Sequence, residues 1–181
     1  MMKYLCAVPL VLLLCLTFAC QDKAAMAELE KFRAQAKLEQ QNKEVVERFF
    51  EEWNKGNIRI ADELYAPEYR WYYSSTTPNP MARRETIEFF RTFVKAFPDA
   101  HWTIQGLFPV GDRVIAWLTI RGTHKGEFQG IQATGNKVEF NGLDMFRIHN
   151  GKIVEERGET DMLGLYQQLG MELKPKEAKK K

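Results

Sequence analysis

The hydrophobic pattern changes from helical to alternating at Pro98, and this change constrains the fold more than any other feature of the chain. Before Pro98, apolar residues recur at helical spacing, as Val46, Phe50 and Trp53 do. After it, four segments alternate apolar and polar side chains, separated by turn signals such as Asn150-Gly151. Helices first and strands afterwards predict an α+β domain. The predicted strands are His101–Val110, Arg113–His124, Lys137–His149 and Lys152–Thr160.

Three helices are predicted before these strands and one after them. The first begins near Asn42 and ends at Gly56. We expect the three N-terminal helices to pack on one face of a strongly curved antiparallel sheet, and the last helix to be short. The other predicted elements are a helix over Ile58–Tyr65, a strand over Glu68–Tyr73, a loop over Ser74–Met81, a helix over Arg84–Phe97 and a helix over Met162–Leu169.

The first twenty residues have the pattern of a secretory signal. Lys3 gives a basic start, Leu5–Ala19 is almost wholly apolar, and Cys20 follows. About fifteen apolar residues are too few to span a bilayer comfortably, so residues 1–19 are predicted to be a signal peptide and not a membrane helix. The other two cysteines of the chain lie inside that segment, so Cys20 is the one left after processing.

The segment Leu16–Cys20, L-T-F-A-C, resembles the lipobox of bacterial lipoproteins, whose cysteine is acylated. The resemblance implies lipidation of Cys20 and attachment to the cell envelope. Gln21 favours the outer membrane, facing the periplasm, if the organism is Gram-negative. The alternative is an ordinary signal peptide followed by a chance cysteine. Residues 20–41 are rich in Ala, Gln, Glu and Lys and are predicted to be a polar helical spacer.

The composition is that of a globular protein with a basic tail. The chain is 45% hydrophobic and 28% charged. Lysines dominate Lys174–Lys181, so residues 173–181 are predicted to be a disordered tail. Such a tail can touch anionic lipid or nucleic acid. We expect a solvated end and no nucleic-acid partner.

Four segments carry a family resemblance. They are Asn42–Gly56, Gly122–Ile131, Asp144–Glu155 and Leu165–Gly170. They resemble the SnoaL-like polyketide cyclase and ester cyclase family, which has the cone-shaped α+β fold of the NTF2-like superfamily. The resemblance covers roughly Asn42 to Met171, most of the predicted mature protein, and places the domain at residues 42–172. It implies a homodimer that pairs through its sheets. Because this fold hosts enzymes, binders and scaffolds, it does not fix an activity.

Asp144 is a carboxylate set in an apolar stripe. Alternate residues of a strand share a face, so Asp144 shares one with Phe140 and with Phe146, a predicted pocket residue. Desolvation on such a face raises the pKa of a carboxyl group, which can then take and return a proton at a carbon acid. Two alternatives stay open: an aspartate neutralised by an arginine or by backbone N–H groups, or one turned outward by a bulge at Gly142.

The segment Val154–Asp161, V-E-E-R-G-E-T-D, holds four carboxylates with a glycine among them. Alternation places three of these carboxylates on one face with Arg157, which is typical of a solvated face. Only Glu156 falls on the opposite face, with Val154, and it is a predicted pocket residue.

On the last predicted strand, this chain departs from the pattern of the family that it resembles. In the aldol cyclases of the family, a single aspartate on the last strand is the acid/base group. Gly158 stands in its place here, and Asp144 stands where those cyclases carry a histidine on the preceding strand. The resemblance therefore leaves two alternatives: Asp144 substitutes for the missing acid, or the pocket only binds.

Aromatic residues and a histidine complete the candidate site. Trp53, Trp71 and Tyr73 could line the open end of a cone, although aromatic residues at such spacing also serve as core. His124, in G-T-H-K-G, is a candidate for a catalytic or a structural role. The sequence has no metal-ligand spacing, phosphate loop or dinucleotide fingerprint, so neither a metal nor a cofactor is predicted.

Two functions from different classes are consistent with this sequence. The first is a lipid-anchored, cofactor-free isomerase, cyclase or lyase that acts on a small apolar molecule by proton transfer. Asp144 would be its base, with Tyr73 or His124 steadying the developing oxyanion. The second is a non-catalytic ligand-binding or protein-interaction module of the cell envelope. Gly158 and the membrane tether favour the second.

Overall fold

The computed structural model describes residues 7–73, 79–172 and 174, and it describes side chains from residue 23 onward. The chain divides into two compact units, Met1–Leu38 and Glu39–Lys181. The side chain of Cys20 and the predicted signal peptide's side chains lie outside the described ones. Within the described residues, no helix has the length and apolar character needed to cross a membrane. The elements are α1 (Ala7–Asn54), α2 (Ile60–Leu64), β1 (Tyr65–Tyr72), β2 (Met81–Ala82), α3 (Arg83–Ala96), β3 (His101–Val110), β4 (Arg113–Thr123), β5 (Lys137–His149), β6 (Lys152–Thr160) and α4 (Met162–Gln168).

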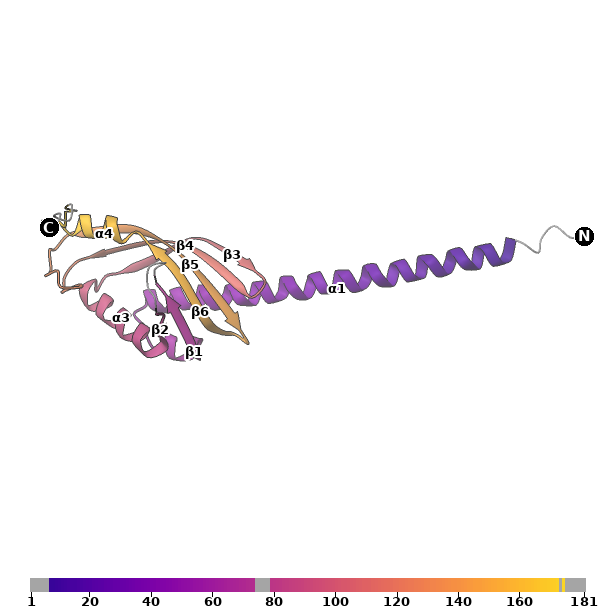
Figure 1. Ribbon diagram of the computed structural model, residues 1–181, viewed down its shortest axis with the longest axis horizontal. Helices are drawn as coiled ribbons and strands as arrows, with labels where there is room; N and C mark the ends of the chain where they lie inside the picture. The colour runs from indigo at the N-terminus through magenta and orange to yellow at the C-terminus, as the bar shows by residue number, and fades with distance from the viewer. Residues whose placement is uncertain (1–6, 74–78, 173, 175–181) are drawn as a thin grey trace, which may run out of the picture. The chain divides into compact units, whose positions relative to one another are not determined.

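The second unit has the predicted α+β architecture, built on one six-stranded sheet (Figure 1). The strand order is β2-β1-β6-β5-β4-β3. The expectation of a purely antiparallel sheet needs one correction, because β1 and β6 pair in parallel and the sheet is therefore mixed. The physical reason is topological: β1 precedes α3 in sequence, yet its neighbour is the last strand of the chain. Alternation along a strand reveals its faces and carries no information on its partner.

The hydrophobic core lies between the helices and one face of the sheet, called the inner face here. Phe49 and Phe50 of α1 pack on Phe146 of β5, with ring centroids 5.9 and 5.8 Å apart. Phe93 of α3 packs on Trp102 of β3, with centroids 5.7 Å apart. The helices thus cover the inner face, as the apolar spacing in the sequence predicts.

Several element boundaries differ from those predicted by one to three residues, and Met81, predicted to end a loop, belongs to the strand β2 because it pairs with Trp71 of β1. Two of the boundary differences have a clear physical reason. Tyr65 begins β1 and does not end α2, because it pairs with Ile153 of β6. His124 is not part of β4, because its backbone bonds across the loop, to Asn136 at 2.9 Å and to Gly135 at 2.9 Å. Both differences depend on partners distant in the fold or on loop geometry, which local patterns do not contain.

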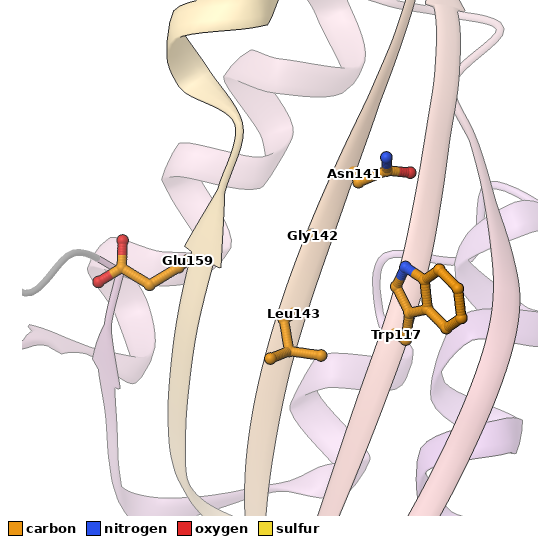
Figure 2. A pocket seen from close by; sticks show the side chains of 5 residues that line it. All are labelled: Trp117, Asn141, Gly142, Leu143 and Glu159. Carbon is orange, nitrogen blue, oxygen red and sulfur yellow. The ribbon is translucent and has the colours of Figure 1, made fainter.

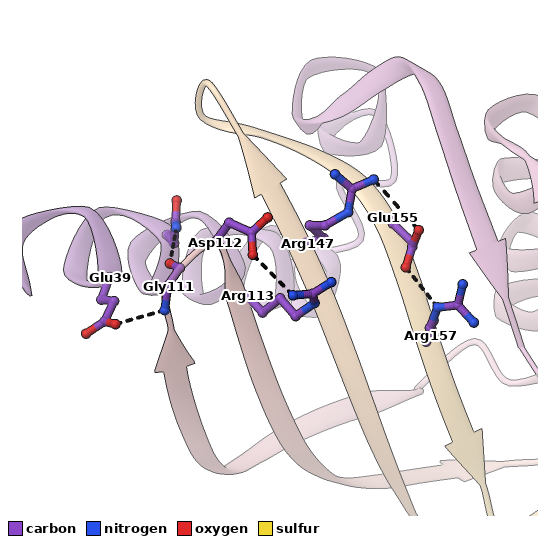
Figure 3. Close-up of polar contacts among 8 residues, drawn as sticks. Glu39, Gly111, Asp112, Arg113, Arg147, Glu155 and Arg157 are labelled. Carbon is purple, nitrogen blue, oxygen red and sulfur yellow. Dashed lines mark hydrogen bonds and ion pairs between the residues drawn. The ribbon is translucent and has the colours of Figure 1, made fainter. Parts of the chain in front are cut away.

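The part of α1 in the second unit is joined to the β3–β4 turn through Gly111 (Figure 3). The Glu39 carboxylate accepts from the Gly111 N–H at 2.8 Å, and the Asn42 side chain donates to the Gly111 carbonyl at 3.1 Å. Gly111 has φ +61°, a conformation that favours glycine. These bonds fix the helix where its aromatic residues begin to cover the inner face.

Candidate active site

The inner face of the sheet and the covering helices enclose a cavity of about 580 Å³. Its floor is the inner face of β5 and β6, its walls come from α1, β1 and α3, and α4 contributes to its rim. The predicted pocket residues Trp53, Trp71, Tyr73 and Glu156 line it, as does Asp144. The other lining residues are Phe49, Phe50, Phe89, Phe90, Phe93, Trp102, Ile120, Phe128, Gln129, Phe140, Glu159, Thr160, Asp161, Met162, Leu163, Leu165 and Tyr166.

Aromatic rings form one wall of this cavity. Phe90 of α3 lies between Trp53 and Trp71, with ring centroids 4.3 and 5.0 Å away. Both tryptophans are more than nine-tenths buried, whereas Tyr73 is 38% exposed and lies at the rim. Flat faces that are fixed by their neighbours suit a planar, largely apolar ligand.

Asp144 projects from β5 into the place where a side chain at position 158 would be. Asp144 pairs with Gly158 of β6, and the register of β5 is continuous through Gly142, so no bulge turns Asp144 outward. A Cβ atom placed on Gly158 would lie 1.8 Å from Asp144 Oδ1. The glycine is therefore what makes room for the aspartate carboxyl group.

Glu156 is the second carboxyl group of the cavity floor and the more deeply buried one, with 3% of its surface exposed. Its Oε2 accepts a hydrogen bond from the Tyr69 hydroxyl at 2.6 Å and a longer one from the Tyr65 hydroxyl at 3.5 Å. The two phenol rings stack with centroids 3.9 Å apart. Sequence reasoning missed both tyrosines, because the contact joins residues 87 and 91 positions apart and no local pattern marks it.

The electrostatics of the cavity are dominated by burial. None of its described lining residues is a lysine, arginine or histidine. Burial raises the pKa of Asp144 from 3.8 to about 7. Burial first, and then the charge of Asp144, raise the pKa of Glu156 from 4.5 to about 8, against the lowering effect of Tyr69 and Tyr65. A carboxyl group that titrates near neutrality is suited to general acid–base catalysis.

The other carboxylates of the V-E-E-R-G-E-T-D segment are placed differently. Glu155 lies on the outer face, 2.8 Å from Arg157 and 3.7 Å from Arg147 (Figure 3). Asp161 caps α4 by accepting from the Gly164 N–H at 2.8 Å. Glu159 lies at the rim of the cavity. Within this segment, the fully inward carboxyl group is therefore Glu156.

Two predicted site residues lie outside the cavity lining. His124 is fully buried, bonded through Nδ1 to Thr134 and stacked on Phe97 with centroids 5.1 Å apart. It holds the loop after β4 and does not face the carboxyl groups. Phe146 is also fully buried, because Phe49 and Phe50 cover it. In the part of the chain that is described, no group of three or more His, Cys, Asp or Glu residues is placed to hold a metal ion.

A second depression, of about 300 Å³, lies on the outer face of the sheet (Figure 2). Trp117 and Leu143 are 50% and 54% exposed there. Neither Asp144 nor Glu156 reaches this depression, so the paired carboxyl groups belong to the inner cavity alone.

The chain is similar in sequence to proteins of a known family. The model of the SnoaL-like polyketide cyclases matches residues 43–169, most of the chain. The chain belongs to the SnoaL-like polyketide cyclase family. This SnoaL-like domain is 33% identical over 130 residues to aklanonic acid methyl ester cyclase DauD from Streptomyces sp. (strain C5), a match that covers 70% of this chain and 80% of DauD.

Solved structures of SnoaL-like proteins share the fold. IdmH from Streptomyces antibioticus, a candidate polyketide cyclase, matches with a TM-score of 0.63 and 28% identity, over 72% of this chain and 99% of IdmH. A candidate polyketide cyclase from Acidithiobacillus ferrooxidans matches with a TM-score of 0.62 and 30% identity, over 72% and 94% of the two chains. The structural similarity confirms the predicted fold class.

Proposed function

We propose that this SnoaL-like domain catalyses a ring closure or isomerisation by proton transfer at a carbon next to a carbonyl group, with Asp144 as the base. The observation that carries the proposal is the position of the Asp144 carboxyl group, whose Oδ1 lies 1.8 Å from a Cβ built on Gly158. The acid that family resemblance places at position 158 is thereby supplied from the neighbouring strand. Its cavity is lined mainly by aromatic and aliphatic side chains and its pKa is about 7, which matches a base that works near neutral pH.

The relative DauD suggests a first substrate. Its name specifies cyclisation of a methyl ester of aklanonic acid, a molecule without the free carboxylate. The cavity here has carboxyl groups and, among its described lining residues, no cationic side chain. An uncharged, largely planar carbonyl compound is therefore the substrate class that we propose, and aklanonic acid methyl ester is the compound to test.

The proposal can be tested by removing the carboxyl group from position 144 of β5 and restoring one at position 158 of β6. Asp144→Asn should bind the ester, as followed by quenching of the fluorescence of the cavity tryptophans, and should lose turnover by ~10²-fold or more. The double variant Asp144→Ala with Gly158→Asp returns a carboxyl group to the family position and should recover part of the activity. Asp144→Ala alone is the matched control.

An unchanged rate in Asp144→Asn would show that Asp144 is not the base. Ester binding without turnover in the wild type would instead favour the alternative function, a ligand-binding module without chemistry. Chromatography of the reaction product separates these two outcomes.

We also propose that the domain is tethered to the cell envelope through a lipid on Cys20, on the basis of the lipobox resemblance. Cys20→Ser should release the protein from membranes and abolish labelling by a radioactive or alkynyl fatty acid. Labelling that persists in this variant would exclude lipidation at Cys20.

A homodimer that pairs through the outer face of the sheet is a further proposal from the family resemblance. Trp117 and Leu143 supply exposed apolar surface on that face. Sedimentation of the fragment from Glu39 onward should give a dimer, and Trp117→Glu with Leu143→Lys should give a monomer. A wild-type monomer at high concentration would contradict the proposal.

A further inference from the structure

We infer that Glu156 is a general acid that works with Asp144, so that two carboxyl groups here divide the work that family resemblance assigns to one. The inference rests on the proposed function. Asp144 removes a proton from the carbon acid, and Glu156 delivers a proton to the oxygen that becomes negative when the ring closes.

The placement of the two groups carries this inference. Asp144 pairs with Gly158, and Glu156 lies two residues before Gly158 on the same face of β6. Such diagonal neighbours on adjacent strands are about 7–8 Å apart at the backbone, within reach of one substrate. Both groups line the cavity, so a ligand there can contact both.

The surroundings decide which group holds a proton. The described titratable groups around the pair are the tyrosines and carboxyl groups of the cavity, and none is cationic. They are Tyr65 and Tyr69 beside Glu156, and Tyr73, Tyr166, Glu159 and Asp161 in the cavity lining. Two buried negative charges without a cation are costly, so one proton stays on the pair near neutral pH. Glu156 is buried whereas Asp144 is half-buried, so desolvation acts more strongly on Glu156, which keeps this proton while Asp144 ionises first.

Hydrogen bonds fix the orientation of the Glu156 carboxyl group. Tyr69 and Tyr65 both donate to Oε2. Among the described residues none bonds to Oε1, which leaves this oxygen to carry the proton toward the cavity. A carbonyl oxygen of a neutral carboxyl group accepts from phenols as a carboxylate does, so the tyrosines are compatible with a protonated Glu156.

The proposed step balances without an oxidant or another reactant. The substrate C–H bond and the Glu156 O–H bond break, together with the π bond of the attacked carbonyl group. A C–C bond, an O–H bond on the product and an O–H bond on Asp144 form. Asp144 is then protonated and Glu156 ionised, and transfer of one proton from Asp144 to Glu156 resets the pair.

The first test is the pH dependence of cyclisation of aklanonic acid methyl ester. The wild-type rate should rise as pH passes about 7, where Asp144 ionises, and fall as pH passes about 8, where Glu156 loses its proton. Glu156→Gln should bind the ester normally, lose turnover by ~10²-fold and lose the alkaline fall. A Glu156→Gln enzyme with the wild-type rate and profile would overturn the inference, while loss of activity in Asp144→Asn would still support the proposed function.

Two tyrosine variants form a matched pair. Tyr69→Phe removes the 2.6 Å bond that lowers the Glu156 pKa, so the alkaline fall should move to higher pH. Tyr65→Phe removes only the 3.5 Å contact and should shift the pH of the alkaline fall in rate by less. Equal profiles in both variants and the wild type would contradict the assignment of the alkaline limb to Glu156.

A third measurement needs no turnover. Carboxyl NMR titration should give the same Asp144 pKa in the wild type and in Glu156→Gln, because glutamine mimics the neutral acid. A fall of the Asp144 pKa in Glu156→Gln would mean that Glu156 is ionised when Asp144 titrates. That result would exclude Glu156 as the acid, whether or not this ester is the substrate.

Discussion

Glu155 and Glu156 are adjacent in sequence and lie in opposite environments. Glu155, on the outer face of β6, contacts Arg147 and Arg157 (Figure 3). Glu156, on the inner face, is buried with two tyrosines and another carboxyl group, and its pKa is about 8. Because a strand alternates its side chains between faces, one residue step separates a surface ion pair from a candidate catalytic acid.

The two faces also differ in what a substitution should cost. On the outer face, side chains meet solvent and charge partners that can rearrange. On the inner face, side chains meet a packed core or a cavity without described cations. A substitution on the inner face should therefore cost more stability than one on the outer face.

The largest difference should come from apolar residues of β5. Phe146→Ala removes a fully buried ring and should lower the free energy of unfolding by about 3–5 kcal/mol. Leu143→Ala, at a residue that is 54% exposed on the outer face, should lower it by less than about 0.5 kcal/mol in a monomeric sample. Urea unfolding measures both, and similar losses would contradict the assignment of faces.

Alkaline pH should destabilise the domain through the inner carboxyl groups. Their pKa values are raised in the folded protein, so this stabilisation is fully present below the unfolded values near 4 and is lost as pH rises through about 7 and 8. We expect the free energy of unfolding to fall between pH 5 and pH 9, as first one and then the other buried carboxyl group ionises. Asp144→Asn and Glu156→Gln should each reduce this fall, and Glu155→Gln should leave it unchanged.

The contact between Asp144 and Gly158 should appear as coupling between two substitutions. Gly158→Ala places a methyl group where Asp144 Oδ1 lies, so the aspartate must rotate, at about 1–3 kcal/mol. In the Asp144→Ala background the same change should cost less, because the obstructing oxygen is gone. Additive costs in this double-mutant cycle would show that the two positions do not compete for space.

The smallest change should follow loss of the outer ion pairs. Glu155→Gln removes the carboxylate that pairs with both Arg147 and Arg157. Because these ion pairs are partly exposed, the free energy of unfolding should fall by about 0–1 kcal/mol. High salt should have little further effect on this variant. A loss of several kcal/mol would mean that the outer face is not the solvated surface described here.

Local patterns in the sequence predicted the order of the helices and strands, apart from β2, and the faces of the strands. The change of hydrophobic period at Pro98 predicted helices followed by strands, and the alternation placed Asp144 and Glu156 on apolar faces of their strands, with a bulge at Gly142 left open as an alternative for Asp144. These features are local, because hydrophobic spacing directly reflects which side chains a helix or strand buries.

What those side chains contact depends on segments that are distant in the sequence. Tyr69 meets Glu156 only because β1 pairs in parallel with β6, and Asp144 meets Gly158 only through the register of β5 on β6. The same is true of His124, whose place in the loop and not in the cavity follows from its contacts with Thr134 and Phe97. Burial by distant segments sets the pKa values and the partners of these groups, and no local spacing in the chain encodes them.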